Sequence, residues 1–373
     1  MKNRYNTMIY PFDMEAIPLI RNNEVISDYN ILYAVAPNGW GFTNKDVGSI
    51  DGGNPIGIIV NSDFDDTLKK CDTVFFTNFN KKLDINQFIY PKIIKACKNE
   101  KNIICTVELE LDKINNIREI CNKNNKVFKY FVNKNDNVNK PEVEEIYEIN
   151  TPIVFITGLT EMSHKFEIQL SLRKHLNNMG YKISQIGSRE YCELMGFHSF
   201  PNFMYSSKFT EYEKVTLFNH YIRNIELTEK PDIILIGIPG GTMPFNRKIT
   251  NKFGILAYQI SQAIVPDVVV MSILCKDNDT EGFLKLLSNS HKFKFGYEID
   301  CYNISSTKLN PNDTERERQL QYVTTDFEFI NKNKRHYCNI DKPLYNIMDK
   351  SDSQNMANFI IEKLAEYGDA ESI

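Results

Sequence analysis

The sequence predicts an α/β protein of two domains, each built on a mostly parallel β-sheet. Short apolar runs alternate with amphipathic helical patterns along most of the chain, which is the order of elements in parallel sheets covered by helices. A polar, apolar-poor stretch at residues 133–148, NKNDNVNKPEVEEIYE, interrupts this alternation and has the composition of a linker. We therefore expect an N-terminal Rossmann-like domain over residues 1–140 and a second domain over residues 150–373, a division that suits a chain of this length.

In the first domain, apolar runs bounded by turn residues predict strands, and helical spacing of apolar residues predicts helices between them. The strands are expected at residues 7–10, 31–36, 56–60, 73–77, 103–107 and 127–131, and the helices at residues 64–70, 85–98 and 113–122. Because strands and helices alternate with short connections, we expect a mostly parallel sheet with helices on both faces.

The second domain opens with an apolar strand at residues 153–156, followed by a short polar loop and an amphipathic helix. Apolar residues fall on one stripe of this helix at Ile168, Leu172, Leu176 and Met179, and Gly180 is placed to end it. Further strands are expected at residues 181–186, 232–237 and 267–273, and further helices at 213–226, 253–264, 281–287 and 356–367. Alternating patterns at residues 295–304 and 321–329 predict an antiparallel edge or hairpin, so the C-terminal extension is expected to be mixed.

Composition and charge narrow the classes of function. A net charge of −4 gives no reason to expect a nucleic acid or an acidic membrane surface as a partner. No apolar run approaches the length that spans a bilayer, and the N-terminal residues lack the apolar core and cleavage site of a signal peptide. The eight cysteines include no C-x-x-C pair, so we expect reduced thiols, no metal site and a cytoplasmic location.

The first strand of the second domain leads into a glycine loop with a lysine, TGLTEMSHKFEIQL at residues 157–170. A working P-loop needs glycines that turn backbone N–H groups inward, a lysine that reaches the phosphates, and a hydroxyl directly after it that holds Mg²⁺. Gly158 and Lys165 are present at a spacing of seven residues. His164 stands where the second glycine is expected, and its Cβ restricts the left-handed geometry there. Phe166 stands where the hydroxyl is expected, so the frame of the motif is present without its metal ligand.

A second glycine turn, DIILIGIPGG at residues 232–241, indicates the same kind of domain. Together the two segments resemble the dethiobiotin-synthetase-like P-loop ATPases, whose loop is also one residue longer than the common motif. Gly237 stands in place of the acidic residue that orders Mg²⁺ or water in those proteins. The resemblance implies a degenerate P-loop NTPase-like domain that does not hydrolyse Mg-nucleotide in the usual way, with ATP or another phosphate-bearing compound as the conceivable ligand. The candidate anion- or nucleotide-binding residues are Gly158, Thr160, Ser163, His164, Lys165, Gly240 and Gly241.

Three segments in this order are similar to the clostridial peptide-maturation-system proteins: DFDDTLKKCDTVFF at residues 63–76, TGLTEMSHKFEIQL, and IGIPGG at residues 236–241. Members of that family are encoded beside radical SAM maturases and small Cys-rich precursor peptides in natural-product clusters. The resemblance implies a cytosolic accessory protein in the maturation of a ribosomally synthesised peptide, with a precursor peptide and a radical SAM maturase as expected partners. It supplies no reaction, so no catalytic residue is carried over and enzymatic activity stays open.

Two other functions stay open. In the first, the protein is a nucleotide- or phosphate-dependent enzyme in which other residues replace the missing metal ligands. In the second, DFDDT matches the D-x-D-x-T pattern of haloacid-dehalogenase-like phosphatases, with Asp63 as nucleophile and Asp65 as acid and base. The alternative for Asp63 is a cap on the helix that follows. His198, in a loop after the second strand of the glycine-loop unit, is a further candidate for a ligand contact.

Overall fold

The computed structural model describes residues 4–79, 81, 83–132, 138–275, 281–334 and 341–370. The chain forms two compact units: residues 1–135 with 190–196, and residues 136–189 with 197–373. The predicted fold class is confirmed, since each unit is an α/β structure built on a parallel sheet. Residues 190–196 depart from the expected order along the chain, because they belong to the first unit although they follow the start of the second.

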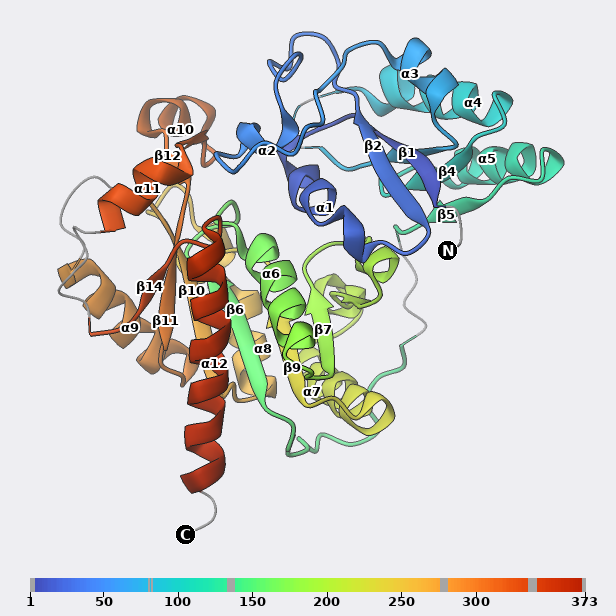
Figure 1. The fold of residues 1–373 in the computed structure, drawn as a ribbon. Helices are drawn as coiled ribbons and strands as arrows, with labels where there is room; N and C mark the ends of the chain where they lie inside the picture. The colour runs from blue at the N-terminus through green and yellow to red at the C-terminus, as the bar shows by residue number, and fades with distance from the viewer. Residues whose placement is uncertain are drawn as a thin grey trace. The chain divides into compact units, whose positions relative to one another are not determined.

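The first unit contains a five-stranded sheet in the order β2-β1-β3-β4-β5, with all neighbouring strands parallel (Figure 1). Its strands are β1 (Tyr5–Tyr10), β2 (Tyr29–Ala34), β3 (Thr73–Phe76), β4 (Asn102–Cys105) and β5 (Phe128–Tyr130). Its helices are α1 (Ile17–Arg21), α2 (Val47–Ile50), α3 (Phe64–Lys70), α4 (Tyr90–Lys98) and α5 (Leu111–Lys123), with a π-helical turn at Ile85–Ile89 before α4. Buried side chains of β1, β3 and β4 pack against α3, α4 and α5 in one core. The strand order is that of flavodoxin-like doubly wound sheets.

One predicted strand of the first unit, at residues 56–60, is wrong. Only an isolated bridge pairs Ile59 with Asp46 in this segment. The Asp46 carboxylate accepts hydrogen bonds from the backbone N–H groups of Ile56 at 2.9 Å and Gly57 at 2.7 Å. A side chain therefore takes backbone donors that a strand would use in a ladder, and the segment is held as a loop.

The second unit contains a seven-stranded sheet in the order β14-β11-β10-β6-β9-β7-β8, again with parallel neighbours. Its strands are β6 (Ile153–Gly158), β7 (Ile183–Gly187), β8 (His198–Ser199), β9 (Ile233–Gly237), β10 (Val268–Leu274), β11 (Cys301–Ser305) and β14 (Leu344–Tyr345). The strands that follow β6 first build the sheet on one side, at β7, β8 and β9, and β10 then continues it on the other side of β6. The winding of the sheet therefore reverses at β6.

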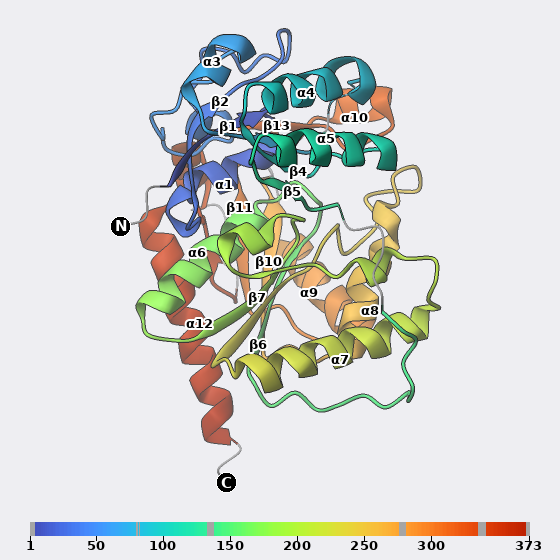
Figure 2. The same cartoon turned by 90° about the vertical axis from the view of Figure 1, so that its right-hand side faces the viewer.

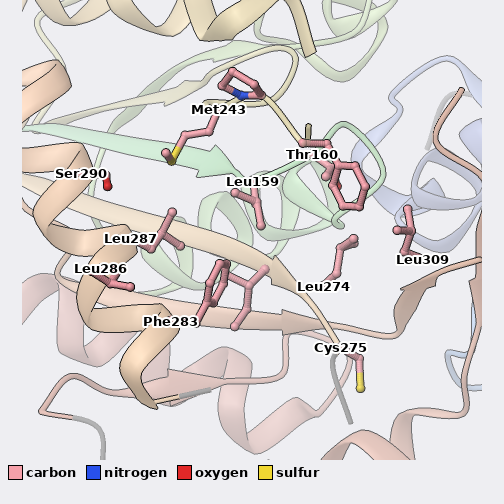
Figure 3. Close-up of a pocket in the computed structure, with 13 residues that line it drawn as sticks. Leu159, Thr160, Met243, Leu274, Cys275, Phe283, Leu286, Leu287, Ser290 and Leu309 are labelled. Carbon is pink, nitrogen blue, oxygen red and sulfur yellow. The ribbon is translucent and has the colours of Figure 1, made fainter. Parts of the chain in front are cut away.

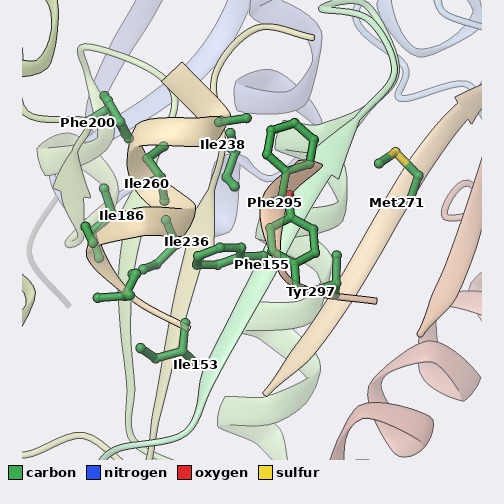
Figure 4. Close-up of a cluster of buried hydrophobic side chains, with 14 of the residues drawn as sticks. Ile153, Phe155, Ile186, Phe200, Ile236, Ile238, Ile260, Met271, Phe295 and Tyr297 are labelled. Atoms are coloured by element: carbon green, nitrogen blue, oxygen red, sulfur yellow. The ribbon is translucent and has the colours of Figure 1, made fainter. Parts of the chain in front are cut away.

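Helices cover both faces of this sheet (Figures 1 and 2). The helices of the second unit are α6 (Lys165–Asn178), α7 (Glu211–Glu229), α8 (Ile255–Ala263), α9 (Glu281–Phe295), α10 (Pro311–Glu317), α11 (Phe327–Asn333) and α12 (Lys350–Ala370). Phe155 points from β6 into a core shared with α7, α8 and α9, part of which Figure 4 shows. Val154 and Ile156 point to the opposite face, where α6 and α12 complete a second core. Burial on both faces explains why β6 is a continuous apolar run.

The C-terminal extension contains both parallel and antiparallel strands, as predicted, but some of them fall at other residues than expected. Strand β13 (Tyr322–Thr324) falls in the pattern predicted at residues 321–329 and is antiparallel as expected, but its partner β12 (Thr307–Leu309) lies outside the pattern predicted at residues 295–304. The first half of the pattern at residues 295–304 is not a strand, because α9 continues to Phe295, and β11 joins the main sheet in parallel. Helices α10 and α11 were not predicted.

The polar stretch between the predicted domains is fixed at its C-terminal end. Tyr147 exchanges two backbone hydrogen bonds of 2.8 Å with the Asn219 side chain on α7. The Glu226 carboxylate accepts the N–H groups of Asn150 and Thr151, each at 2.7 Å. Residues 147–151 therefore lie against α7 and lead into β6. Within the described part of the chain, no helix has both the length and the apolar character that crossing a membrane needs.

Candidate anion-binding site

The segment at residues 158–165, which we call the anion loop, joins the carboxyl end of β6 to the amino end of α6. In doubly wound sheets, ligands bind at the carboxyl ends of the strands where the winding reverses, and β6 is that strand here. The 14 residues of α6 follow directly, so its free N–H groups and its dipole place partial positive charge at the loop. The sheet and the helix therefore both favour an anion at this position.

The loop closes back over its first residue. A Cβ atom on Gly158 would lie 2.4 Å from Ser163 Oγ and 2.8 Å from Lys165 Cδ, so only glycine fits there. Ser163 is fully buried, and its hydroxyl donates to the Thr160 carbonyl oxygen at 3.1 Å. The structure thus brings together four of the residues that the sequence singles out: Gly158, Thr160, Ser163 and Lys165.

His164 has a backbone conformation that glycine adopts more readily than other residues. It has φ 60° and ψ 18°, in the left-handed region, immediately before α6 begins. Histidine is one of the few residues other than glycine that adopt this region with some frequency. Its Nε2 atom lies 3.4 Å from the hydroxyl of Ser306, just after β11. The expected restriction by the Cβ atom therefore does not prevent a left-handed turn at this position.

Lys165 is buried rather than solvated. It is the first residue of α6, is only 5% exposed, and donates a hydrogen bond from Nζ to the carbonyl oxygen of Gly240. Burial lowers the pKa of Lys165 to about 8, and the nearby Glu161 opposes this shift. A cation in this position is disfavoured both by burial and by the helix dipole, so a bound anion would stabilise it.

The second glycine turn packs directly against the anion loop. Gly240 has φ 77°, and a Cβ atom on Gly241 would lie 2.6 Å from the Leu159 carbonyl oxygen. Asn251 joins the two segments, since its side-chain nitrogen donates to the carbonyl oxygens of Leu159 and Met243, each at 3.2 Å. The predicted residues Gly240 and Gly241 therefore belong to the same site as the loop. Asn251 was missed, and no local pattern around it indicates this role.

Gly237, at the end of β9, leaves room for the side chain of Gln169. A Cβ atom at Gly237 would lie 2.0 Å from Gln169 Nε2. Gln169 is fully buried on α6, one turn after Lys165, and neither its amide nitrogen nor its oxygen has a hydrogen-bond partner among the described residues. The glutamine thus occupies the space that an acidic side chain at position 237 would need. Its helical spacing from Lys165 is the signal in the sequence that could have identified it.

Phe166, at the position expected for a Mg²⁺ ligand, is an anchor for α6. It is 4% exposed, and the Arg189 guanidinium lies 5.6 Å from the centre of its ring. The ring of Phe197 lies 6.5 Å away. An aromatic ring offers no ligand to a metal ion, and these contacts fix it in place.

A chain of buried hydrogen bonds supports the loop from the neighbouring strands. Ser272 on β10 donates from its hydroxyl to the Ser163 carbonyl oxygen and accepts from Asn303 Nδ2 on β11 at 2.9 Å. The Asn303 Oδ1 atom in turn accepts the backbone N–H of Ile347 at 2.8 Å. Ser272 and Asn303 are both fully buried. Sequence reasoning missed both, because their partners are distant in the chain.

A cavity of about 460 Å³ lies beside the loop in the second unit (Figure 3). The first two residues after Gly158, Leu159 and Thr160, form part of its wall. The remaining walls come from the segment after the second glycine turn, the end of β10, α9 and β12. The residues that line it are Leu159, Thr160, Met243, Pro244, Phe245, Ile273, Leu274, Cys275, Phe283, Leu286, Leu287, Ser290 and Leu309.

The structure does not bring His198 to the loop. This residue lies on β8, the edge strand, which is separated from β6 by β9 and β7. Its Nε2 atom is 2.5 Å from Glu229 Oε1, and Glu229 also accepts a hydrogen bond from the Ser184 hydroxyl. His198 therefore takes part in a polar cluster at the edge of the sheet.

The two aspartates of the phosphatase-like motif have structural partners in the first unit. Asp63 is the N-cap of α3, and its carboxylate accepts the N–H of Asp66 at 2.9 Å. Asp65 accepts a hydrogen bond from Lys95 Nζ at 2.6 Å, and this bond lowers the pKa of Asp65. Among the residues that the structure describes, no group of three or more His, Cys, Asp and Glu side chains is placed to hold a metal ion.

Comparison with protein-family models finds no match to this chain, and comparison with curated proteins finds none either. A crystal structure of a DUF1611 family protein from Anabaena variabilis is similar, with a TM-score of 0.62 and 9% sequence identity over 96% of this chain and 100% of that chain. At this identity the likeness concerns the fold alone. A GTPase from Pyrococcus abyssi in its apo form has a TM-score of 0.26 and 19% identity over 45% of this chain and 72% of that chain, a likeness too low to carry an argument.

Proposed function

We propose that this protein is a cytosolic accessory protein in the maturation of a ribosomally synthesised peptide, and that it binds a phosphate-bearing ligand at the anion loop without Mg²⁺. The main observation behind the ligand is Lys165, a buried lysine at the amino end of α6 that points at a second glycine turn. The left-handed His164 keeps the turn of a phosphate-binding loop, and Phe166 and Gly237 omit its metal ligands. The role in peptide maturation rests on the resemblance of three sequence segments.

The ligand is tested with inorganic pyrophosphate as the probe, in titration calorimetry with and without Mg²⁺. We expect binding by the wild-type protein that does not require the metal ion. Lys165→Met should weaken binding by about 10- to 100-fold, since hydrogen bonds to charged groups contribute roughly 1.5–3 kcal/mol. Lys174→Met, which changes an exposed lysine on the same helix, is the matched control and should retain wild-type affinity.

Two results would refute the proposed ligand: no heat of binding at millimolar pyrophosphate, or equal binding by the Lys165→Met and Lys174→Met proteins. Binding that appears only with Mg²⁺, together with hydrolysis of ATP, would instead favour a phosphate-dependent enzyme with other metal ligands. The phosphatase function has less support, because Asp63 and Asp65 are engaged in a helix cap and an ion pair.

The peptide-maturation role is tested by recovery of the tagged protein from a producing cell, followed by mass spectrometry. We expect a small Cys-rich precursor peptide or a radical SAM maturase among the retained proteins. Retention of neither, at a wash stringency that preserves micromolar complexes, would count against this role and leave the ligand question separate.

A further inference from the structure

The cavity beside the anion loop has a size and an opening that suit a small molecule. Its volume of about 460 Å³ falls in the range of ligand pockets, roughly 300–1,000 Å³. Two apolar side chains of its wall are exposed: Leu286 is 67% accessible and Phe245 is 42% accessible. These exposed side chains extend the apolar lining to the surface of the protein.

The lining of the cavity is apolar. Of the 13 described residues that line it, only Thr160 and Ser290 are polar, and these 13 include no charged, amide or imidazole side chain. A nucleobase carries several hydrogen-bond donors and acceptors, and each would lose its contact with water in such a pocket without a side-chain partner in return. An alkyl or isoprenoid group has no such groups to satisfy. The lining therefore disfavours a nucleobase and favours a hydrocarbon chain as the bound group.

The cavity and the anion loop share a wall. Leu159 and Thr160 belong to both. Met243, another residue of the cavity wall, follows Thr242, whose backbone N–H donates to the Gly158 carbonyl oxygen at 3.1 Å. A molecule with its phosphate at the loop therefore has the cavity as its neighbouring space.

A second lysine bonds to the segment that follows the second glycine turn. Lys294, on α9, donates hydrogen bonds to the carbonyl oxygens of Thr242 at 3.0 Å and Phe253 at 2.6 Å. Helix α9 also supplies Phe283, Leu286, Leu287 and Ser290 to the wall. Cationic groups from Lys165 and Lys294 thus accompany an apolar pocket, a combination that suits an amphipathic anion.

We infer that the ligand is a phosphate or diphosphate ester of an apolar alcohol, with its charged group at the anion loop and its hydrocarbon chain in the cavity. This inference rests on the proposed phosphate binding at the loop and adds the chemical class of the ligand. Each methylene group that enters the cavity should tighten binding by roughly fourfold, the value for full removal from water.

The test compares four probes by titration calorimetry: geranyl diphosphate, inorganic pyrophosphate, geraniol and ADP. We expect geranyl diphosphate to bind at least 100-fold more tightly than pyrophosphate, and more tightly than either geraniol or ADP. Ser290→Trp should fill the cavity. It should therefore remove the extra affinity that the hydrocarbon chain gives geranyl diphosphate, and leave the affinity for pyrophosphate unchanged. Asn289→Trp, at the adjacent exposed position of α9, is the matched control and should still bind geranyl diphosphate more tightly than pyrophosphate.

The outcomes separate this inference from the proposed function. If pyrophosphate binds but geranyl diphosphate binds no better, or if ADP binds best, the inference is wrong and the phosphate site stands. If geraniol binds as tightly as geranyl diphosphate, the cavity and the loop are independent, which also overturns it. If no phosphate compound binds, the proposed phosphate binding at the loop fails, and this inference fails with it. Ser290→Leu, with a smaller increase in volume, replaces the tryptophan variant if that protein does not fold, and should reduce the extra affinity in part.

Discussion

At the residue scale, Lys165 has its ammonium group against the backbone carbonyl of Gly240, away from water. Its pKa of about 8 is below the usual value of 10.5 for lysine because burial disfavours the charged form. A buried ammonium group with a lowered pKa is found either at a functional site or where the rest of the structure offsets the free energy of its burial. In this site the charge faces the second glycine turn, at Gly240.

The shifted pKa predicts how the stability of the protein depends on pH. Below pH 8 the lysine is protonated in both the folded and the unfolded chain, so its burial reduces stability. Between pH 8 and 10.5 the folded protein releases the proton first, and this cost disappears as the pH rises. Lys165→Met should therefore be more stable than wild type at pH 7 by an amount that shrinks by on the order of 3 kcal/mol up to pH 10.5.

Urea denaturation of the two proteins at several pH values measures this difference. Lys174→Met should follow the wild-type profile, since its side chain is exposed on the same helix. A difference between wild type and Lys165→Met that is constant from pH 7 to 10.5 would show that the Lys165 ammonium is solvated.

At the scale of elements, the neighbouring strands β10 and β11 help to hold the anion loop in its shape. The hydrogen bonds from Ile347 through Asn303 and Ser272 to Ser163 cross β11 and β10 to reach the loop. A chain of this kind acts as a unit, because the loss of one member leaves the next with an unsatisfied buried group. The loop therefore owes its conformation to strands that are distant in the sequence as well as to its own residues.

Ser272→Ala and Asn303→Ala should each lower the free energy of unfolding by about 1–3 kcal/mol, the cost of leaving a buried polar group unpaired. The double variant should lose clearly less than the sum of the two, because both changes break the same chain. Chemical denaturation of the four proteins in the cycle measures the coupling. Ser261→Ala, a change in a serine that bonds only within α8, should add to Ser272→Ala without coupling. Additivity of Ser272→Ala and Asn303→Ala would contradict a connected chain.

At the scale of the whole molecule, the two units are not simply the first and the second part of the sequence. Residues 190–196 belong to the first unit, although they lie between β7 and β8 of the second. Tyr191 is 7% exposed, and its ring stands edge-on to that of Phe75 on β3 at 5.6 Å between centroids. The first unit is therefore completed by a segment from the second half of the sequence.

Tyr191→Ala should destabilise the first unit by about 3 kcal/mol, the usual cost of removing a buried aromatic ring. The single tryptophan of the chain, Trp40, belongs to this unit, so its fluorescence reports the unfolding of the first unit alone. We expect the fluorescence midpoint in urea to fall in Tyr191→Ala. Tyr205→Ala, an exposed tyrosine of the second unit, should leave it unchanged. Equal midpoints in all three proteins would show that residues 190–196 contribute nothing to the first unit.

Local patterns in the sequence were sufficient for most of the fold. The stripe through Ile168, Leu172 and Leu176 predicted α6, and these side chains are buried against the sheet. The continuous apolar run of β6 predicted a central parallel strand. Gly158 and Lys165 predicted the loop between them, because a strand, a glycine turn and a helix are each specified by neighbouring residues.

Tertiary structure decided the local structure wherever residues that are distant in the sequence contact the same backbone or side-chain groups. The Asp46 carboxylate holds residues 56–57 as a loop, although the apolar pattern at residues 56–60 predicted a strand. The burial of Lys165 depends on Gly240, which lies 75 positions away, and the fit of Gln169 depends on Gly237. The sequence alone thus determined the two parallel sheets and the frame of the anion loop. The burial of the lysine and the apolar cavity beside the loop were decided by long-range packing. Burial and desolvation arise only after strands and helices that are distant in the sequence have packed together.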